Sequence, residues 1–323
     1  MFVECLLLVV GLALLVWSAD RFVFGAAAIA NNFGLPPMII GLTIVALGSS
    51  APEVMVSATA ALEGKMNTAV GNVIGSNITN ITLVLGVTAL FKPLFVSSST
   101  LFRELPMVLA ATAFAGWILH DQHLGYIEGT LLLTIFVTMM AFLIIGSLRQ
   151  RNNAKLDPMM EEAASEVPKD VATSKALLWL AVGLVLLPIS ADILVGSASE
   201  IARYFGISDL VIGLTIIAIG TSLPELAACI AGVIKKEDDL VLGNIIGSNL
   251  FNILAVLAVP AMLAPGPIDA LAAERDFYVM MGVTLLLFVM SMSFFGRSRK
   301  ISRWEGAILC CSFVAYQLLL FSA

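Results

Sequence analysis

The stretches GLTIVALGSSAPE at residues 41–53 and AVGNVIGSNITN at residues 69–80 decide how this chain folds. Both return later in the chain, as GLTIIAIGTSLPE at residues 213–225 and LVLGNIIGSNLFN at residues 240–252. The second pair follows the first at a constant shift of 172 positions. Each copy ends its first motif on a glutamate within sequence that is otherwise apolar. The chain is therefore built on an internal repeat that carries a duplicated acidic position.

The composition indicates a membrane protein. The chain has 323 residues, of which 59% are hydrophobic and 12% are charged, and its mean hydropathy is +1.00. Soluble domains usually carry about a quarter charged residues. Apolar runs of about 20 residues, long enough to cross a hydrocarbon core of about 30 Å, recur along the chain. We predict ten spans, at residues 3–23, 37–60, 69–91, 104–120, 125–147, 174–197, 209–233, 241–263, 277–295 and 304–322.

The repeat divides the ten predicted spans into two halves of five. Residues 1–147 form the first half, with its motifs within 41–91, and residues 174–323 form the second, with its motifs within 213–263. Residues 148–173 form a polar linker loop. Because five is an odd number, the two halves must enter the membrane from opposite sides. The predicted fold is an all-α polytopic membrane protein made of two inverted-topology five-helix repeats.

The basic residues predict the orientation, because Lys and Arg collect in cytoplasmic loops. The loops that follow the odd-numbered spans, the 148–173 linker among them, hold 14 of the 17 basic residues. The opposite face holds Lys65, Arg203 and Arg275. This asymmetry predicts that both termini lie outside the membrane and that the linker is cytoplasmic.

The first acidic motif has the groups that a cation site needs. Pro52 removes a backbone donor in mid-span and frees carbonyl oxygens around Ala46. Such broken backbone persists at membrane depth only where it lines a cavity or coordinates something. Ser49 and Ser50 add hydroxyl oxygens beside the break, and Glu53 adds a carboxylate one turn further on. The second copy supplies the same groups from Ala218, Thr221, Ser222 and Glu225.

Each second motif adds hydroxyl and amide oxygens. Ser76 and Asn80 are four residues apart and share a helix face, and Ser248 and Asn252 repeat this spacing. An all-oxygen set of this kind suits hard cations such as Ca²⁺ and Na⁺, and no His or Cys joins it, which argues against zinc or copper. The glycines of these motifs should let neighbouring helices approach closely; they are Gly71, Gly75, Gly243 and Gly247.

Two glutamates within the bilayer need neutralisation. One carboxylate near the bilayer centre costs about 2.5–3.5 kcal/mol. Two that face each other should not both stay ionised without a metal ion or a proton, so the site should couple cation occupancy to protonation. The alternative is a protonated glutamate that donates a hydrogen bond between helices, but two matched motifs that each contain a proline break favour an ion site.

Other polar residues suggest structural roles. Asp20 and Asp192 match across the repeat, and we expect each to cap a helix or to pair with a loop. We expect His120, Asp121 and His123 to lie in a solvated turn between the fourth and fifth spans. The four cysteines are interpreted as small apolar side chains.

The motifs GSSAPE and GTSLPE, with GNVIGSNITN and GNIIGSNLFN, closely resemble those of the calcium/cation antiporter superfamily. The chain looks like one of its prokaryotic members of the sodium/calcium exchanger type. The resemblance implies that Glu53 and Glu225 are the central ion ligands and that the oxygens described above complete the site. It implies exchange of Na⁺ for Ca²⁺ by alternating access at the midplane of the inner membrane, with spans 1 and 6 sliding across the rest. The ions are then substrates and no cofactor or nucleic acid is involved, and we expect the chain to work as a monomer.

The chain departs from the family pattern at two places. Ser49 stands where many members have Thr, which keeps the hydroxyl. Asn252 stands where some members have Asp, so the cluster has two formal negative charges. Two charges balance one Ca²⁺, whereas three Na⁺ would leave a net positive charge.

Rival functions remain open at this point. The same two glutamates suit a Ca²⁺/H⁺ antiporter, in which protons replace Na⁺. A cation channel could use them as a selectivity filter, although the inverted repeat argues against it. The chain has no HExxH, GxSxG or nucleotide-binding loop, so the sequence gives no support to an enzyme.

Overall fold

The computed structural model describes residues 2–35, 37–98, 100–153, 171–206, 218–292 and 299–322, without the side chains of 147–153, 218, 321 and 322. Nearly all regular structure in these segments is helical. The chain separates into two compact units. Unit 1 is Met1–Ser49 with Met139–Asn244, and unit 2 is Ser50–Thr138 with Ile245–Ala323. Each unit combines segments of both sequence repeats, and the repeat bounds at residues 147 and 174 stay a prediction.

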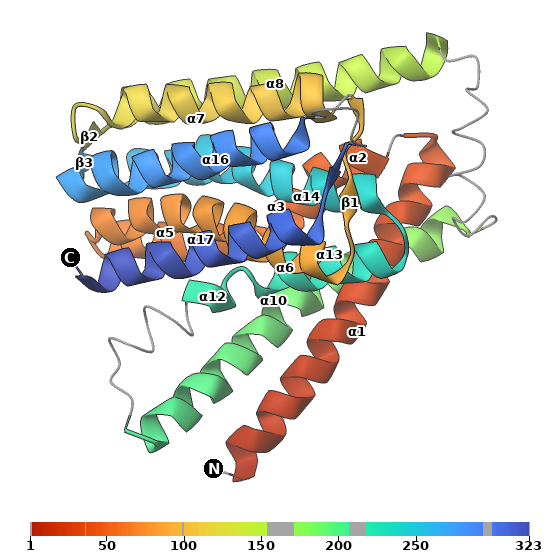
Figure 1. The fold of residues 1–323 in the computed structure, drawn as a ribbon, viewed down its shortest axis with the longest axis horizontal. Coiled ribbons are helices and arrows are strands. Elements are labelled where there is room, and N and C mark those ends of the chain that lie inside the picture. The colour runs from red at the N-terminus through yellow and green to blue at the C-terminus, as the bar shows by residue number, and fades with distance from the viewer. Residues whose placement is uncertain are drawn as a thin grey trace. The chain divides into compact units, whose positions relative to one another are not determined.

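The helices of unit 1 come from the starts of the two repeats (Figure 1). They are α1 (Phe2–Phe33), α2 (Pro37–Ile40), the π-helix η1 (Gly41–Val45), α3 (Ala46–Ser49), α10 (Thr173–Tyr204), α12 (Ala218–Gly220) and α13 (Leu223–Ile234). Two further helices, α8 (Tyr126–Asn153) and α14 (Asp238–Phe251), run from one unit into the other.

Unit 2 holds the remaining helices and all of the described strands. Its first-repeat elements are α4 (Ala51–Leu62), α5 (Met66–Thr79), η2 (Asn80–Val84), α6 (Leu85–Phe91), β1 (Leu94–Phe95), η3 (Thr100–Glu104), α7 (Leu105–Leu119) and β2 (His123–Leu124). Its second-repeat elements are η5 (Asn252–Val256), α15 (Ala258–Leu263), β3 (Gly266–Pro267), η6 (Ala272–Asp276), α16 (Phe277–Ser291), β4 (Lys300–Ile301) and α17 (Arg303–Ser322).

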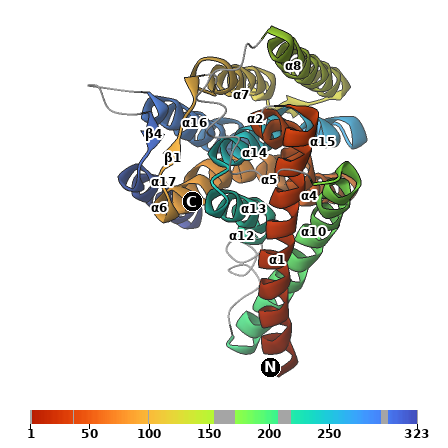
Figure 2. The same cartoon turned by 90° about the vertical axis from the view of Figure 1, so that its right-hand side faces the viewer.

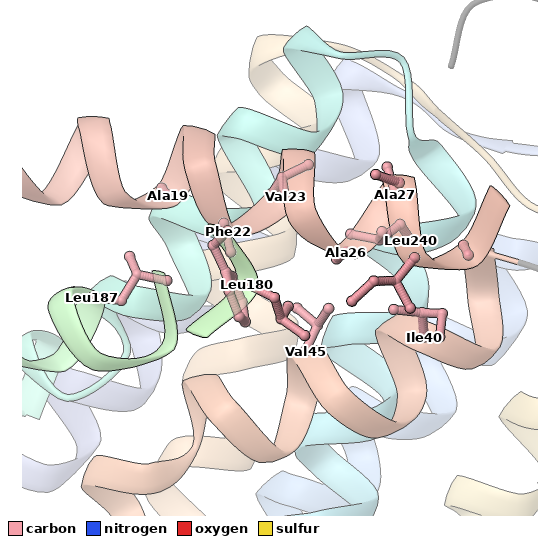
Figure 3. Packing of buried hydrophobic residues seen from close by; sticks show 14 of the residues in the cluster. Ala19, Phe22, Val23, Ala26, Ala27, Ile40, Val45, Leu180, Leu187 and Leu240 are labelled. Carbon is pink, nitrogen blue, oxygen red and sulfur yellow. The ribbon is translucent and has the colours of Figure 1, made fainter. Parts of the chain in front are cut away.

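Unit 1 is organised by the packing of α1 on α10, which Figure 2 shows side by side. The approach is close because glycines lie at the crossing. A Cβ added at Gly25 would fall 2.5 Å from the Leu180 backbone nitrogen, and one added at Gly183 would fall 2.4 Å from the Cβ of Phe22. Phe22 and Leu180 belong to the buried apolar cluster of this unit (Figure 3). The other faces of α1 and α10 remain exposed and apolar, as lipid-facing helices require.

In unit 2 the helices pack in pairs, α6 with α17 and α7 with α16. Gly86 and Gly306 lie at the first crossing, where a Cβ on Gly306 would fall 2.7 Å from the Gly86 carbonyl oxygen. The loops at the helix ends form two antiparallel strand pairs, β1 with β4 and β2 with β3.

The element bounds follow the repeat. The starts of α4 and α13, α5 and α14, η2 and η5, and α7 and α16 are each separated by 172 residues, and so are the starts of β1 and β3. Each strand of this last pair joins a strand from the other repeat, since β1 pairs with β4 and β3 with β2. The internal repeat seen in the sequence is therefore also a repeat of secondary structure.

The membrane-spanning character predicted from composition is confirmed. Six helices in the described part of the chain are long and apolar enough to cross a membrane, and Pro37–Ser49 with Ala51–Leu62 form a seventh candidate that bends by 44°. The predicted end of the first span at residue 23 is wrong, because α1 continues to Phe33 through an alanine-rich, buried stretch. Likewise α10 continues beyond the predicted residue 197 to Tyr204, and α8 runs to Asn153. Residues 154–170 of the predicted linker and the first residues of the predicted seventh span lie outside the described residues.

Candidate cation site

The first acidic motif forms a helix break. α3 ends at Ser49, Ser50 leaves the helical conformation with φ −85° and ψ 10°, and α4 begins at Ala51. Pro52 lies in the first turn of α4, where its missing N–H would have no helical partner in any case. The break expected in mid-span is therefore present, and the proline starts the second helix of the bent pair. Glu53 follows in the same turn and is completely buried.

The second acidic motif repeats this geometry. α12 ends at Gly220, Ser222 adopts φ −93° and ψ 5°, and α13 begins with Pro224 in its first turn. Glu225 lies in that turn and is 1% exposed. The N-terminus of a helix carries partial positive charge, so both carboxylates stand where an anionic group is stabilised.

In unit 2 the second motifs of the two repeats meet. Asn80 donates a hydrogen bond from Nδ2 to the Oδ1 of Asn249 at 3.3 Å. Ser76, Ser248 and Asn252 are also buried. Within the described residues, neither side-chain polar atom of Asn252 has a hydrogen-bond partner, nor does the Oδ1 of Asn80. A buried amide without a partner destabilises a fold by about 1–3 kcal/mol, so these oxygens are suited to a ligand.

In unit 1 the close approach of two motif glycines sets the geometry. A Cβ on Gly41 would fall 2.5 Å from the Leu240 carbonyl oxygen, and a Cβ on Gly243 would fall 2.5 Å from the Met38 carbonyl oxygen. The close packing predicted for the second-motif glycines is thus present at Gly243. At Gly71 and Gly75 the prediction is wrong, because no described atom outside their own helix backbone lies within 4 Å of an added Cβ.

The unit boundary passes through both kinds of motif. One boundary lies between Ser49 and Ser50, in the first acidic motif. Another lies between Asn244 and Ile245, in the second motif of the second repeat. Unit 1 therefore holds six of the predicted ligands, namely Ala46, Ser49, Ala218, Thr221, Ser222 and Glu225. Unit 2 holds the other six, namely Ser50, Glu53, Ser76, Asn80, Ser248 and Asn252. The Ala46 carbonyl, predicted to be free, lies 3.4 Å from the Ser49 hydroxyl.

Sequence reasoning missed the polar residues that surround these ligands. Asn72 donates to the Glu53 carbonyl oxygen at 3.1 Å and to the Ser57 hydroxyl at 2.9 Å. Its counterpart in the second repeat, Asn244, contacts Ser49 and Cys229. The signal was available, because both asparagines follow the first glycine of their motif. Cys229 is therefore more than an apolar side chain, since it accepts a hydrogen bond in the buried interior.

Outside the motifs, Asp20 pairs with a loop, as one of the two expected roles requires. Its carboxylate lies 2.6 Å from the Lys235 ammonium group in the turn between α13 and α14, and 3.3 Å from Arg21 on its own helix. Asp192 is exposed on α10. In the same turn as Lys235, burial and the nearby acidic residues at 238 and 239 raise the pKa of Glu237 above its ordinary value.

The predicted turn between the fourth and fifth spans is exposed. His120 and Asp121 are solvent-accessible, and Asp121 accepts a hydrogen bond from the backbone N–H of His123. No group of three or more His, Cys, Asp or Glu side chains that could hold a metal ion occurs in the segments that the structure describes.

Comparison with known proteins adds a family to this geometry. The family model described as "Sodium/calcium exchanger protein" matches residues 3–145 and 175–322. "Putative antiporter CaxA" of Alkalimonas amylolytica is 55% identical over 323 residues, which cover 100% of both chains. "Sodium/calcium exchanger MaX1" of Methanosarcina acetivorans is 30% identical, with 99% of each chain covered.

A solved structure extends the similarity to the fold. The sodium-calcium exchanger NCX_Mj, soaked with zero Na⁺ and Ca²⁺, matches with a TM-score of 0.83 and 30% sequence identity, over 99% of both chains. The fold class predicted from the repeat, an all-α membrane protein of the exchanger type, is thereby confirmed, whereas the count of ten spans stays a prediction.

Proposed function

This chain belongs to the sodium/calcium exchanger protein family, and we propose that it exchanges Na⁺ for Ca²⁺ by alternating access at one site that binds the two ions in turn. Membership makes it a multi-pass membrane antiporter of cations and not an enzyme, and the ions are its substrates and not cofactors. The proposal adds the coupling ion, the ligands and the orientation.

The observation that carries the proposal is the burial of two matched glutamates. Glu53 is 0% exposed and Glu225 is 1% exposed, each in the first turn of a helix that begins after a break. A buried carboxylate needs a compensating charge or a proton. The two negative charges of these carboxylates are neutralised by one Ca²⁺ ion. Na⁺ ions can take the place of Ca²⁺ at the same oxygens.

We assign the ligands from the motifs of both repeats. The carboxylates provide the charge, and the neutral oxygens complete the coordination shell. The proposed neutral ligands are the carbonyls of Ala46 and Ala218, the hydroxyls of Ser49, Ser50, Ser76, Thr221, Ser222 and Ser248, and the amides of Asn80 and Asn252. The partnerless Asn252 oxygen supports this set, because a cation would satisfy it.

Charge then controls the switch between the two sides. With Glu53 and Glu225 ionised and no cation bound, the site carries two negative charges, and moving it through a low-dielectric barrier is unfavourable. Either ion set removes most of that charge and permits switching. Because only the ion-bound protein switches sides readily, one ion is exchanged for the other. The protein with an empty site stays on one side.

The distribution of basic residues supports an orientation. We propose that the chain lies in the inner membrane of a prokaryote with both termini outside and residues 148–173 in the cytoplasm, because 14 of the 17 Lys and Arg residues fall on the side of that linker. We also propose that a single chain is sufficient for exchange.

Equilibrium binding tests the shared site without requiring transport. Radioactive Ca²⁺ binding to purified protein should fall as Na⁺ is added, and Glu53→Gln and Glu225→Gln should each abolish it. Glu63→Gln serves as the control, because Glu63 is exposed and pairs with Lys65. Ca²⁺ binding that ignores Na⁺ but falls as the pH is lowered would point to proton coupling instead.

A further inference from the structure

Asn244 lies between a proposed ligand and a buried thiol in unit 1. It is 0% exposed. Its Oδ1 accepts a hydrogen bond from the Ser49 hydroxyl at 3.1 Å, and its Nδ2 lies 3.6 Å from the Cys229 sulfur. Asn244 therefore connects Ser49 of the first acidic motif to Cys229 of α13, the helix that begins in the second acidic motif.

Backbone packing fixes the place of Asn244. The preceding residue, Gly243, lies against the Met38 carbonyl oxygen, and the Asn244 backbone nitrogen would lie only 2.9 Å from a Cβ built on Gly41. α14 is therefore held against the segment that leads into Ser49. Donation by Nδ2 to Cys229 then orients the amide so that Oδ1 faces Ser49, since the two ends of an amide are chemically distinct.

The contact between Ser49 and Asn244 affects how the Ser49 hydroxyl can bind a cation. A serine hydroxyl has one hydrogen and two lone pairs, and it can coordinate a cation only through a lone pair. The acceptors within reach of the Ser49 hydrogen include Asn244 Oδ1 at 3.1 Å and the Ala46 carbonyl oxygen at 3.4 Å. If the hydrogen went to Ala46, it would compete with a cation for that carbonyl oxygen as well.

We propose that Asn244 is a positioning residue for the cation site: it accepts the Ser49 hydrogen, so that this hydrogen does not compete with the ion for the lone pairs of the Ser49 hydroxyl and the Ala46 carbonyl. This role rests on the proposed function, because it presumes that Ser49 is a ligand. It acts through Ser49 and does not require Asn244 to touch the cation.

The counterpart of Asn244 in the first repeat offers a matched comparison. Asn72 occupies the equivalent position, but its Nδ2 donates to the Glu53 carbonyl oxygen and to Ser57. Both asparagines are thus held by hydrogen bonds near an acidic motif, but these two acceptors of Asn72 do not include a proposed ligand hydroxyl. Asn72→Ala therefore controls for the loss of a motif asparagine without the loss of the Ser49 contact.

A double-mutant cycle in proteoliposomes tests the role. The half-saturating Na⁺ and Ca²⁺ concentrations and the maximum exchange rate are measured for wild type, Ser49→Ala, Asn244→Ala and the double variant. We expect Asn244→Ala and Ser49→Ala to raise the half-saturating concentration of the same ion by roughly 3- to 10-fold, the loss of about one hydrogen bond or ligand, with the maximum rate little changed. The half-saturating concentration of the double variant should be no higher than that of Ser49→Ala alone, because Asn244 acts only through Ser49.

Three further variants keep the test decisive. Asn72→Ala should combine additively with Ser49→Ala. Cys229→Ala and Asn244→Asp each keep an acceptor for the Ser49 hydrogen, so Ser49→Ala should still have its full effect in both backgrounds; these carry the test if Asn244→Ala does not fold. Additive losses in Ser49→Ala/Asn244→Ala, or a lost Ser49→Ala effect in the Asp background, would overturn the positioning role alone. Wild-type affinity in Ser49→Ala would instead overturn Ser49 as a ligand and, with it, the proposed site.

Discussion

The crossing of α14 over the first acidic segment gives the strongest structural prediction, through Gly243→Ala. The new Cβ would lie 2.5 Å from the Met38 carbonyl oxygen and 3.1 Å from the Leu42 nitrogen. Ordinary van der Waals contact begins near 3.4 Å. Because the atoms opposite are backbone, no side chain can rotate away, and the two segments must separate by most of an ångström.

The separation should reduce both stability and cation affinity. Overpacking of this kind destabilises a fold by about 1–3 kcal/mol. With an unfolding entropy of about 2.1 cal/mol/K per residue over 323 residues, this lowers Tm by roughly 1–5 °C. The Ser49–Asn244 hydrogen bond, now 3.1 Å long, would open beyond the roughly 3.5 Å limit of a hydrogen bond. The half-saturating cation concentration should therefore rise as in Asn244→Ala.

Thermal unfolding of the detergent-purified protein, read as the fraction that remains monodisperse after heating, measures the first effect. Gly196→Ala is the matched control in unit 1, because it lies in α10 with no described atom within 4 Å of an added Cβ. The control should leave Tm unchanged or raise it slightly, since alanine is the better helix former. If Gly243→Ala were as stable as Gly196→Ala, the close approach and the geometry built on it would be wrong.

Three other outcomes follow from individual residues. Asn252→Leu removes a buried amide that has no described partner. Its Tm without added cations should therefore equal or exceed that of the wild type, while Ca²⁺ should no longer raise Tm. A Tm below that of the wild type without cations would contradict this. Asp20→Ala and Lys235→Ala should show a coupling of about 0.2–1 kcal/mol in a double-mutant cycle at low salt, because the pair is partly exposed, and the coupling should vanish in high salt; coupling that persists in high salt would argue against this. The raised pKa of Glu237 means that its ionisation destabilises the fold, so Glu237→Gln should raise Tm near pH 7 and lose this advantage as the pH falls below the ordinary value of 4.5; an equal advantage at both pH values would refute the argument.

The repeat made much of the fold predictable. A shift of 172 residues placed the helix breaks at Ser50 and Ser222 and the matched starts of α4 and α13, because proline and serine have local conformational preferences that a sequence displays. The length of α1 was not predictable in the same way. Asp20 and Arg21 resemble a helix end in the sequence, but ion pairing allows them to lie within a continuous helix.

Two features of the site were beyond sequence reasoning. The π-helices that begin at Asn80 and Asn252 have no residue signature, although π-helical turns are frequent at functional sites. The contact of Asn244 with Ser49 joins positions 195 residues apart, and only the folded chain shows that one asparagine reaches a hydroxyl of the other repeat. The chemical types of the ligands were visible in the motifs, whereas the hydrogen-bond partners that orient them depend on tertiary packing.

The central claim is that Na⁺ drives Ca²⁺ movement through a site that needs both buried glutamates. Ca²⁺ uptake into proteoliposomes loaded with Na⁺ and diluted into Na⁺-free buffer at fixed pH tests it most directly. The account predicts uptake that requires the outward Na⁺ gradient, disappears in Glu53→Gln and in Glu225→Gln, and persists in Glu63→Gln. Uptake that proceeds equally without Na⁺, or that survives in both glutamine variants, would contradict it.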